Sequence, residues 1–557
     1  MASYDEDMTV LKYLDKYARD KADEIYMVDR KRGKEISYTF AQVQETVASV
    51  ARSLGTLFAE GGNSISILSN NRAHWAMCDL GVLRSGNVLA PVFATMLPDT
   101  FRFAIEFAAI KLLFVGEAAN WEQVKGVLPQ SVTIVSLPGV DIPGAHLTFD
   151  EFIALGADTR LPDHPNPEAL CTIVFTSGTT GMPKGVMHSL QTLHAFVATV
   201  CAFSGEQERF YSYLPLAHLG DRGASVFQSL HVGGRLTFND TVDTFVADLI
   251  AAAPTFLMGV PRIWEKLLQG VLATTGMDSD TLRSALQTDV GGELAQRIRE
   301  GLGLHNARFL VAATAATPDS IKAWYALLGM PLHDVYGQTE ICPVTCSPPA
   351  QDGRAGVGAP CPGFDVMIAE DGEIMCSGPG TALGYYKNPE KTAATFVDGW
   401  VHTGDKGYLD PQGHVHITGR LTDTFKTAKG KYVAPGPIEN TFASCVLVEQ
   451  QCLYGYSLTQ PIMLCTLSAT APEDRAEIAG ELTAHAEWVN QRLEPHEKIG
   501  GLIISPTSWN AESGVLTHTL KVKRDKVAER YQKEIETVAS QLMASDRSLV
   551  LEWARCS

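Results

Sequence analysis

A short segment between residues 176 and 185 collects the residue types that bind polyphosphates. Glycines let backbone N–H groups approach phosphate oxygens, hydroxyls donate further hydrogen bonds, and a lysine neutralises charge. A surface turn would not need so many of these groups around one lysine. The segment therefore predicts a phosphate-binding loop made by Thr176, Ser177, Gly178, Thr179, Thr180, Gly181 and Lys184.

The spacing of this loop differs from that of a Walker A motif. That motif requires Gly, four residues, Gly, Lys and then Ser or Thr. Here Lys184 follows Gly181 by three residues and precedes Gly185. The spacing argues against a P-loop ATPase.

Two elements are expected to position the loop. The β-branched run from Thr172 to Phe175 predicts a buried strand before it. Apolar residues at steps of three and four predict one face of a helix after it, and these are Val186, Leu190, Leu193, Val197 and Val200.

Two later segments offer groups for the rest of a nucleotide. In VYGQTE, residues 335–340, Tyr336 can lie against a purine base, Thr339 can donate to a phosphate oxygen, and Glu340 can hold Mg²⁺. In WVHTGDKGYLD, residues 400–410, Asp405 can accept hydrogen bonds from two ribose hydroxyls. An Asp in a turn is commonly just a turn former.

The loop sequence TSGTTGMPKG resembles the signature of the AMP-forming adenylate enzymes. That superfamily includes acyl-CoA synthetases, firefly-type luciferases and adenylation domains of peptide synthetases. The resemblance extends to VYGQTE, which implies that Tyr336, Gly337, Gln338 and Thr339 bind AMP. A strand is expected just before that segment, over residues 312–318.

Segments around the expected domain junction and near the end of the chain resemble the same family. TGD and ITGRLTD match its paired junction segments and imply that Asp405 binds ribose and Arg420 contacts the nucleotide. Thr422 stands at the pivot position, where the family often has Asp or Lys. GVLTHTLKVKRDKV resembles the segment that carries the catalytic lysine, which would be Lys521.

Three further segments resemble the long-chain fatty acyl-CoA synthetase branch. They are YLPLAH, PTFLMGVPRIWEK and KTAKGKYVAPGPIEN. By resemblance, His218 in the first segment is the gate of the acyl site. Taken alone, that histidine would be a core residue with its hydrogen bonds satisfied.

The activity implied by these segments is ATP-dependent formation of acyl-AMP with release of pyrophosphate, followed by acyl transfer to coenzyme A. The cofactors and co-substrates are ATP, Mg²⁺ and coenzyme A. Glu340 and Thr176 are the expected Mg²⁺ ligands, and Lys521, Glu340, Thr176 and Lys184 the expected catalytic residues. A ligase for an aromatic or unusual acid, or one that loads a carrier protein, remains an alternative, although no carrier domain is expected after Lys521.

Length and the alternation of apolar runs set the expected fold. A chain of 557 residues is longer than one hydrophobic core usually supports, so at least two domains are expected. Strand-like runs such as 64–70 and 309–315 alternate with helical segments, which predicts an α/β protein with mostly parallel sheets and crossover helices. We expect a large domain over residues 1–419 and a small mobile α+β domain over residues 420–557.

Composition limits partners and location. The formal net charge of −18 disfavours nucleic acid as a partner. No signal peptide or membrane-spanning run is evident, so a cytoplasmic enzyme is expected, with at most peripheral contact with the inner membrane face and a possible homodimer. The 11 cysteines favour buried thiols over a disulfide framework or a metal site at Cys342 and Cys346.

Overall fold

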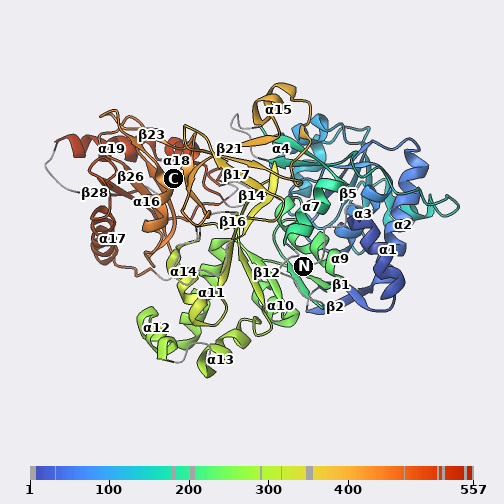
Figure 1. Cartoon of the computed structure of the whole chain (residues 1–557), viewed down its shortest axis with the longest axis horizontal. Coiled ribbons are helices and arrows are strands. Elements are labelled where there is room, and N and C mark those ends of the chain that lie inside the picture. The colour runs from blue at the N-terminus through green and yellow to red at the C-terminus, as the bar shows by residue number, and fades with distance from the viewer. Residues whose placement is uncertain are drawn as a thin grey trace. The chain divides into compact units, whose positions relative to one another are not determined.

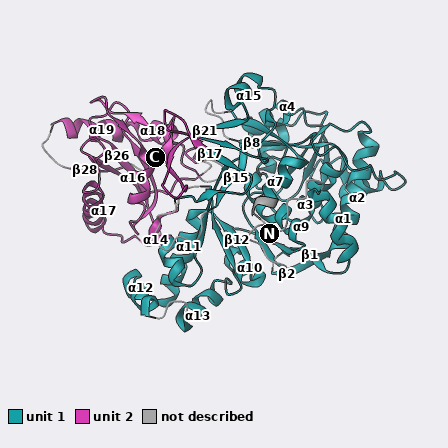
Figure 2. Cartoon of the chain, in the orientation of Figure 1, with its two compact units in different colours: residues 1–315, 322–366, 375–402 teal, residues 316–321, 367–374, 403–557 magenta. Residues whose placement is uncertain are grey.

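The structure is a computed structural model, traced from the N-terminus to the C-terminus in Figure 1. It describes residues 8–31, 33–176, 182–200, 207–288, 292–314, 317–346, 356–468, 471–510, 513–516, 521–544 and 549–554. The chain forms two compact units, coloured separately in Figure 2. Unit 1 comprises residues 1–315, 322–366 and 375–402, and unit 2 comprises residues 316–321, 367–374 and 403–557.

Unit 1 contains a nine-stranded sheet. Its central pairings are parallel, and antiparallel strands stand at both edges. In spatial order the strands are β16 (Ala359–Pro360), β15 (Ile341–Cys346), β14 (Leu332–Gln338), β13 (Phe309–Ala312), β12 (Phe256–Gly259), β10 (Arg209–Ser212), β11 (Arg235–Phe238), β1 (Ile25–Lys31) and β2 (Lys34–Thr39).

A second sheet of unit 1 has eight strands and carries the phosphate-loop segment. Parallel pairings run from β8 to β7, and β8–β9 and β9–β19 are antiparallel. In spatial order the strands are β19 (Gly384–Tyr385), β9 (Lys184–Ser189), β8 (Leu170–Thr176), β4 (Val88–Leu89), β3 (Ser64–Leu68), β5 (Leu112–Val115), β6 (Thr133–Ser136) and β7 (Leu147–Thr148).

Helices connect the parallel strands, as crossover connections require. Thr39 and Gln42 form a capping box at α2, which fixes where that helix begins. The helices up to residue 395 are α1 (Val10–Asp20), α2 (Phe40–Leu57), α3 (Ala73–Arg84), α4 (Pro98–Phe107), α5 (Trp121–Val124), α6 (Phe149–Ala154), α7 (Leu190–Val200), α8 (Leu219–Asp221), a π-helix (Arg222–Phe227), α9 (Gln228–Val232), α10 (Phe245–Ala252), α11 (Pro261–Thr275), α12 (Ser279–Thr288), α13 (Glu293–Gly301), α14 (Asp319–Leu327) and α15 (Pro389–Thr395).

The two large sheets share one hydrophobic core. Ile65 and Val174 from the eight-stranded sheet belong to the same buried cluster as Phe210 and Phe256 from the nine-stranded sheet. Burial of both faces explains why these parallel strands are continuous apolar runs. The predicted α/β class with mostly parallel sheets and crossover helices is confirmed.

A buried ion pair ties three elements of unit 1 together. Arg222 Nε and Nη2 donate to the two oxygens of Asp79 on α3 at 2.7 and 2.5 Å. Arg222 Nη1 donates to Thr172 Oγ1 on β8 at 2.9 Å. The side chains of Asp79 and Arg222 are 0% and 1% exposed, so each charge depends on the other for compensation.

The strand predicted before the phosphate loop is confirmed, but the element after it is different. Residues Lys184–Ser189 form β9, antiparallel to β8, and α7 begins only at Leu190. The prediction that Val186 lies on the helix was therefore wrong. Val186 pairs with Val174, and Ser189 Oγ accepts a hydrogen bond from Thr192 N at 3.2 Å where the helix begins.

The strand expected over residues 312–318 was also placed wrongly. Strand β13 ends at Ala312, and Thr314 has a φ of 75°, outside the β region. Ala313 and Thr314 follow the strand and do not extend it.

Unit 2 has a four-stranded sheet covered by helices. The sheet order is β25 (Val448–Tyr454), β26 (Ile462–Leu467), β27 (Gly501–Ser505) and β28 (Val550–Trp553), and the hairpin β23 (Phe425–Lys426) with β24 (Tyr432–Val433) precedes it. Leu464 lies on one face, packed in a cluster with Val527, and Met463 lies on the other, packed with Leu482. The helices are α16 (Pro435–Phe442), α17 (Arg475–Asn490), α18 (Arg524–Arg530) and α19 (Gln532–Ala544).

Five strands between residues 365 and 420 complete the fold. They are β17 (Asp365–Ile368), β18 (Glu373–Ser377), β20 (Phe396–Val397), β21 (Trp400–Leu409) and β22 (Val415–Arg420). The boundary predicted after residue 419 separates a large domain from a small mobile domain, and this boundary stays a prediction.

Nine of the cysteines lie in the described ranges, and all are buried or half-buried thiols. Burial raises the pKa of six of them to about 12, and these are Cys171, Cys342, Cys346, Cys361, Cys452 and Cys465. Separately, none of the described helices is long and apolar enough to cross a membrane.

We predict that Asp79→Ala lowers the free energy of unfolding by about 3–5 kcal/mol, because it leaves the buried Arg222 charge without a partner. The measurement is urea unfolding followed by tryptophan fluorescence. Asp99→Ala is the control, because it removes an exposed pair with Arg102 and should change stability by at most about 1 kcal/mol. Equal losses in the two variants would contradict this role for the buried pair.

Candidate active site

Lys184 and Glu340 form an ion pair that a third side chain completes. Lys184 Nζ donates to Glu340 Oε1 at 2.7 Å and to the Tyr385 hydroxyl at 3.0 Å. The Tyr385 hydroxyl donates to the same Glu340 oxygen at 2.7 Å. Residues from three distant parts of unit 1 thus converge on one carboxylate oxygen.

Backbone pairing fixes the position of Lys184. Lys184 is the first residue of β9 and pairs with Thr176, the last residue of β8. The ammonium group therefore lies at the same end of the sheet as the loop between these two residues. Ser177, Gly178, Thr179, Thr180 and Gly181, which the sequence assigns to phosphate binding, lie outside the described residues.

Thr176 presents a buried hydroxyl at the loop's entrance. Its Oγ1 has no hydrogen-bond partner within the described ranges. A buried hydroxyl without a partner is unfavourable, so a hydrogen bond from this hydroxyl to a bound group would be stabilising. The predicted assignment of Thr176 to phosphate and Mg²⁺ fits this orphaned atom.

Glu340 is kept ionised in spite of its burial. Burial alone would raise its pKa, but the charge of Lys184 and the hydrogen bonds from Lys184 and Tyr385 outweigh this and lower the pKa. Burial and the charge of Glu340 raise the pKa of Tyr385, so its hydroxyl remains a donor at neutral pH. The cluster therefore holds a carboxylate, an ammonium group and a neutral phenol.

His188 links β9 to the segment around Glu340. Its Nε2 lies 2.8 Å from the carbonyl oxygen of Thr339, and its Nδ1 lies 3.1 Å from Thr192 Oγ1. Burial lowers the pKa of His188 to about 4, so the neutral ring donates to the carbonyl at physiological pH. Sequence reasoning missed this residue, which positions Thr339 and Glu340.

The remaining residues of VYGQTE lie at the end of β14. Tyr336, Gly337 and Gln338 occupy its last positions, and Tyr336 is only 7% exposed. A side chain at Gly337 would meet Cys342 Sγ at 3.1 Å, so the close packing of β15 favours glycine there. The structure thus brings Glu340 to Lys184 and leaves the purine contact of Tyr336 a prediction.

Unit 2 holds its own group of predicted residues. Asp405 on β21 pairs with Arg420 on β22, and Arg420 Nε lies 3.1 Å from Asp405 Oδ1. Lys521 lies within electrostatic range of both, and its pKa is lowered by desolvation and by Arg420 and raised by Asp405. The Lys521 side chain is nonetheless exposed to solvent. Neighbouring protein atoms therefore desolvate it only in part.

Thr422 follows this group in a turn. Its Oγ1 lies 3.5 Å from Asp423 Oδ1, at the limit of a hydrogen bond. The pivot role of Thr422 stays a prediction.

His218 caps the short helix α8. Its Nδ1 accepts a hydrogen bond from Gly220 N at 3.0 Å. The loop before it is held by Asn71, which follows β3 and whose Nδ2 donates to the Leu214 carbonyl at 2.6 Å. Sequence reasoning missed Asn71, although its position just after a parallel strand is where ligand sites of such sheets form.

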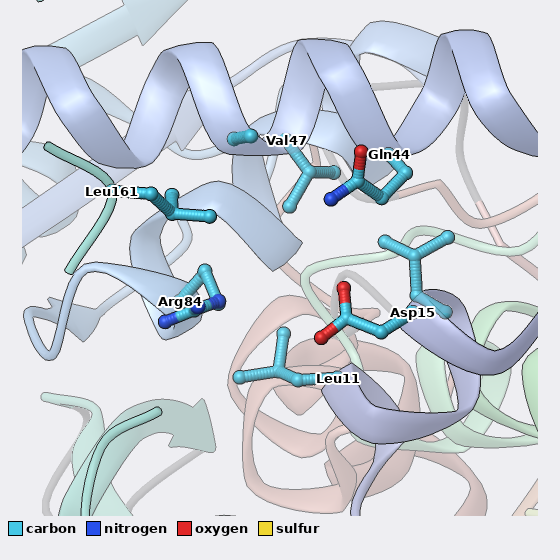
Figure 3. A pocket seen from close by; sticks show the side chains of 8 residues that line it. Leu11, Asp15, Gln44, Val47, Arg84 and Leu161 are labelled. Carbon is cyan, nitrogen blue, oxygen red and sulfur yellow. The ribbon is translucent and has the colours of Figure 1, made fainter. Parts of the chain in front are cut away.

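A pocket elsewhere in unit 1 contains none of the predicted residues. Figure 3 shows it between α1 and α2, with Asp15 and Arg84 among its lining side chains. Asp15 Oδ2 lies 2.8 Å from His164 Nε2, and Arg84 donates to the Pro162 carbonyl. These polar groups have partners within the protein. The pocket is lined by Leu11, Leu14, Asp15, Gln44, Val47, Ala48, Arg84 and Leu161.

The donor set around Glu340 suits Mg²⁺ better than a transition metal. No group of three or more His, Cys, Asp or Glu residues that could hold a metal occurs in the described part of the chain. Mg²⁺ usually takes one or two protein oxygens and completes its shell with water and substrate phosphates. Glu340 and Thr176 could supply such a partial shell.

Comparison with known proteins places this geometry in a family. The sequence profile of AMP-binding enzymes matches residues 14–386, and that of the AMP-binding enzyme C-terminal domain matches residues 422–542. The chain belongs to the AMP-binding enzyme family. Adenylating enzymes of this family use ATP and Mg²⁺ with coenzyme A as co-substrate, and the residues around Lys184 and Glu340 fit ATP and Mg²⁺.

Several relatives are named as ligases of fatty or long-chain acids. The chain is 31% identical to the putative fatty-acid–CoA ligase fadD11 of Mycobacterium tuberculosis, over 68% of this chain and 75% of that protein. It is 26% identical to the long-chain-fatty-acid–CoA ligase FadD15 of Mycobacterium bovis, over 90% and 92%. It is 28% identical to long chain acyl-CoA synthetase 5 of Arabidopsis thaliana, over 91% and 87%.

Solved structures of adenylating enzymes share the fold. The A domain of a carboxylic acid reductase from Segniliparus rugosus, in complex with AMP, superimposes with a TM-score of 0.80 at 21% identity, covering 96% of this chain and 94% of that one. The anthranilate CoA ligase AuaEII superimposes with a TM-score of 0.77 at 20% identity, covering 95% and 98%. At these identities the likeness concerns the fold alone.

Proposed function

We propose that this AMP-binding enzyme is a fatty acid–CoA ligase for medium or long chains. It would form acyl-AMP and pyrophosphate from a fatty acid and ATP, and then transfer the acyl group to the thiol of coenzyme A. The observation that carries the first step is the convergence of Lys184 and Glu340 beside the orphaned hydroxyl of Thr176.

The first step brings two anions together, so its barrier is largely electrostatic. The carboxylate oxygen of the acid attacks the α-phosphorus of ATP, and the bond to the bridging oxygen of pyrophosphate breaks. Lys184 would hold the departing pyrophosphate, and the Glu340 carboxylate would bind the Mg²⁺ that offsets phosphate charge. The Thr176 hydroxyl would donate a hydrogen bond to the same phosphates or contribute an oxygen to the Mg²⁺.

The group in unit 2 supplies the remaining contacts in this proposal. Asp405 would accept hydrogen bonds from the ribose hydroxyls, and Arg420 would contact the nucleotide near its phosphates. Lys521 would bridge the substrate carboxylate and the α-phosphate. The lowered pKa of Lys521 still leaves its amine available for this contact, because anionic substrates favour the charged form.

The second step requires Lys521 to leave and a thiol to enter. The sulfur attacks the carbonyl carbon of acyl-AMP, and AMP departs as the leaving group. We propose that residues 420–557 turn about Thr422 between the two steps. His218, which caps α8 and is solvent-accessible in part, is the proposed gate of the acyl site.

The acid is assigned from the names of relatives and from the sequence segments that resemble the long-chain fatty acyl-CoA synthetase branch. The three relatives described above are named as ligases of fatty or long-chain acids, which favours a fatty acid over an aromatic one. The anthranilate ligase and the carboxylic acid reductase share only the fold, so they do not change this assignment.

The experiment that tests the function measures exchange of labelled pyrophosphate into ATP with a panel of acids. Exchange requires a reversible adenylate. We expect exchange when a fatty acid of medium or long chain and Mg²⁺ are present. We expect acyl-CoA to form when coenzyme A is added. Exchange only with aromatic acids, or acyl transfer only to a carrier protein, would contradict the proposed substrate or acceptor.

We predict that Lys521→Ala lowers the rate of adenylation by about 100- to 1000-fold, because it removes a charge that acts in the transition state. The rate of thioester formation from supplied acyl-AMP should change less than threefold. Both half-reactions are measured separately, with Lys523→Ala as the control for loss of a nearby charge. Survival of adenylation together with loss of thioester formation would refute the role assigned to Lys521.

We predict that Asp405→Ala raises the KM for ATP by about 10- to 100-fold, since two hydrogen bonds to a charged group are lost. The KM for the acid should change little. Asp410→Asn, which removes a charge from the turn of the same hairpin, is the control. A KM for ATP that stays at the wild-type value would count against ribose binding by Asp405.

A further inference from the structure

The hydroxyl of Tyr385 is the one part of the Lys184–Glu340–Tyr385 cluster to which the proposed mechanism gives no task. It touches both charged groups, at 3.0 Å from Lys184 Nζ and 2.7 Å from Glu340 Oε1. The Tyr385 ring also faces the ammonium group, whose nitrogen lies 4.6 Å from the ring centroid. Tyr385 therefore contacts the lysine by two separate interactions.

The backbone around Tyr385 is fastened to the strand that begins with Lys184. Leu383 N donates to the Met187 carbonyl, and Tyr386 N donates to the Gly185 carbonyl, both at 2.8 Å. Tyr385 itself pairs with Val186. The phenol is thus held by the strand on which Lys184 stands.

The same segment also holds the backbone of Glu340. Ala382 N donates to the Glu340 carbonyl at 2.9 Å. Tyr385 N donates to Thr392 Oγ1 at 2.9 Å, which ties the segment to α15. The position of the phenol relative to both charged residues is therefore set by backbone hydrogen bonds that do not involve its hydroxyl.

In the proposed function, substrate binding separates Lys184 from Glu340. In the proposed function Lys184 turns to phosphate oxygens and Glu340 to Mg²⁺. Both would then lose a partner at 2.7 Å, whereas the Tyr385 hydroxyl can keep its bond to Glu340 Oε1. A donor that stays on Oε1 restricts the rotation of the Glu340 carboxylate.

We propose that Tyr385 is a positioning residue: its hydroxyl keeps the Glu340 carboxylate in one orientation while Lys184 moves from Glu340 to the phosphates and Mg²⁺ arrives. This proposal rests on the proposed function, because it assigns Glu340 and Lys184 to Mg²⁺ and phosphate. It adds a residue that determines how tightly and how productively the metal–nucleotide pair is held.

Tyr385→Phe tests the proposal because it removes the hydroxyl and keeps the ring over Lys184. We expect the Kd for Mg²⁺·ATP, measured by calorimetry without an acid, to rise about three- to tenfold. The rate of acid-dependent pyrophosphate exchange should fall about tenfold, and the Mg²⁺ concentration for half-maximal exchange should rise. Thioester formation from supplied acyl-AMP should stay within twofold of wild type, since that step does not use the pyrophosphate groups.

Tyr386→Phe is the matched control. It removes a hydroxyl from the next residue of the same segment, whose ring packs against Phe107, and it should leave all four quantities within twofold of wild type. An unchanged Kd and Mg²⁺ dependence in Tyr385→Phe would overturn the proposal. An equal fall in both half-reactions with a lowered melting temperature would also overturn it, because the hydroxyl would then serve only stability. Absence of exchange in the wild-type protein would instead refute the proposed function.

Discussion

The ion pair between Lys184 and Glu340 is the constraint around which unit 1 is arranged. Its partners are 156 residues apart in sequence, and one stands on the eight-stranded sheet while the other follows a strand of the nine-stranded sheet. Without Lys184, the Glu340 carboxylate would be a buried charge with less compensation, which is unfavourable. The shared core of the two sheets, the His188 bond to Thr339 and the segment 382–386 all act to keep these two side chains together.

In the proposed function, the charged groups that act in adenylation are divided between the two units. Unit 1 provides the ammonium and carboxylate groups of Lys184 and Glu340, and unit 2 provides Asp405, Arg420 and Lys521. Within unit 2 the two cations repel each other, and Arg420 lowers the pKa of Lys521. An anionic substrate would relieve this repulsion. The proposed function thus gives a physical reason for keeping two positive groups close together on one unit.

Local sequence predicted the parts of the site that depend on local chemistry. The strand before the phosphate loop follows from its β-branched run, the lysine at Lys184 was named from residue type and spacing, and the carboxylate at Glu340 was named because its segment resembles the family's nucleotide segment. The strand β9 was mistaken for the start of a helix because Val186 also fits the spacing of the helix that begins at Leu190. Only pairing with β8 decides between the two, and pairing is a tertiary property. His188, Asn71 and Tyr385 were missed for a similar reason, since each acts through a residue that is 45 or more positions away in sequence.

The burial of the cysteines has a chemical consequence for a protein that makes activated acyl groups. An acyl adenylate is an electrophile that reacts with thiolates, and a thiol with a pKa of about 12 is almost wholly protonated at pH 7. Cys171, on the strand that leads to the phosphate loop, and Cys342, two residues after Glu340, are both held in this protonated state by burial. Burial thereby makes these two thiols poor competitors of an incoming thiol.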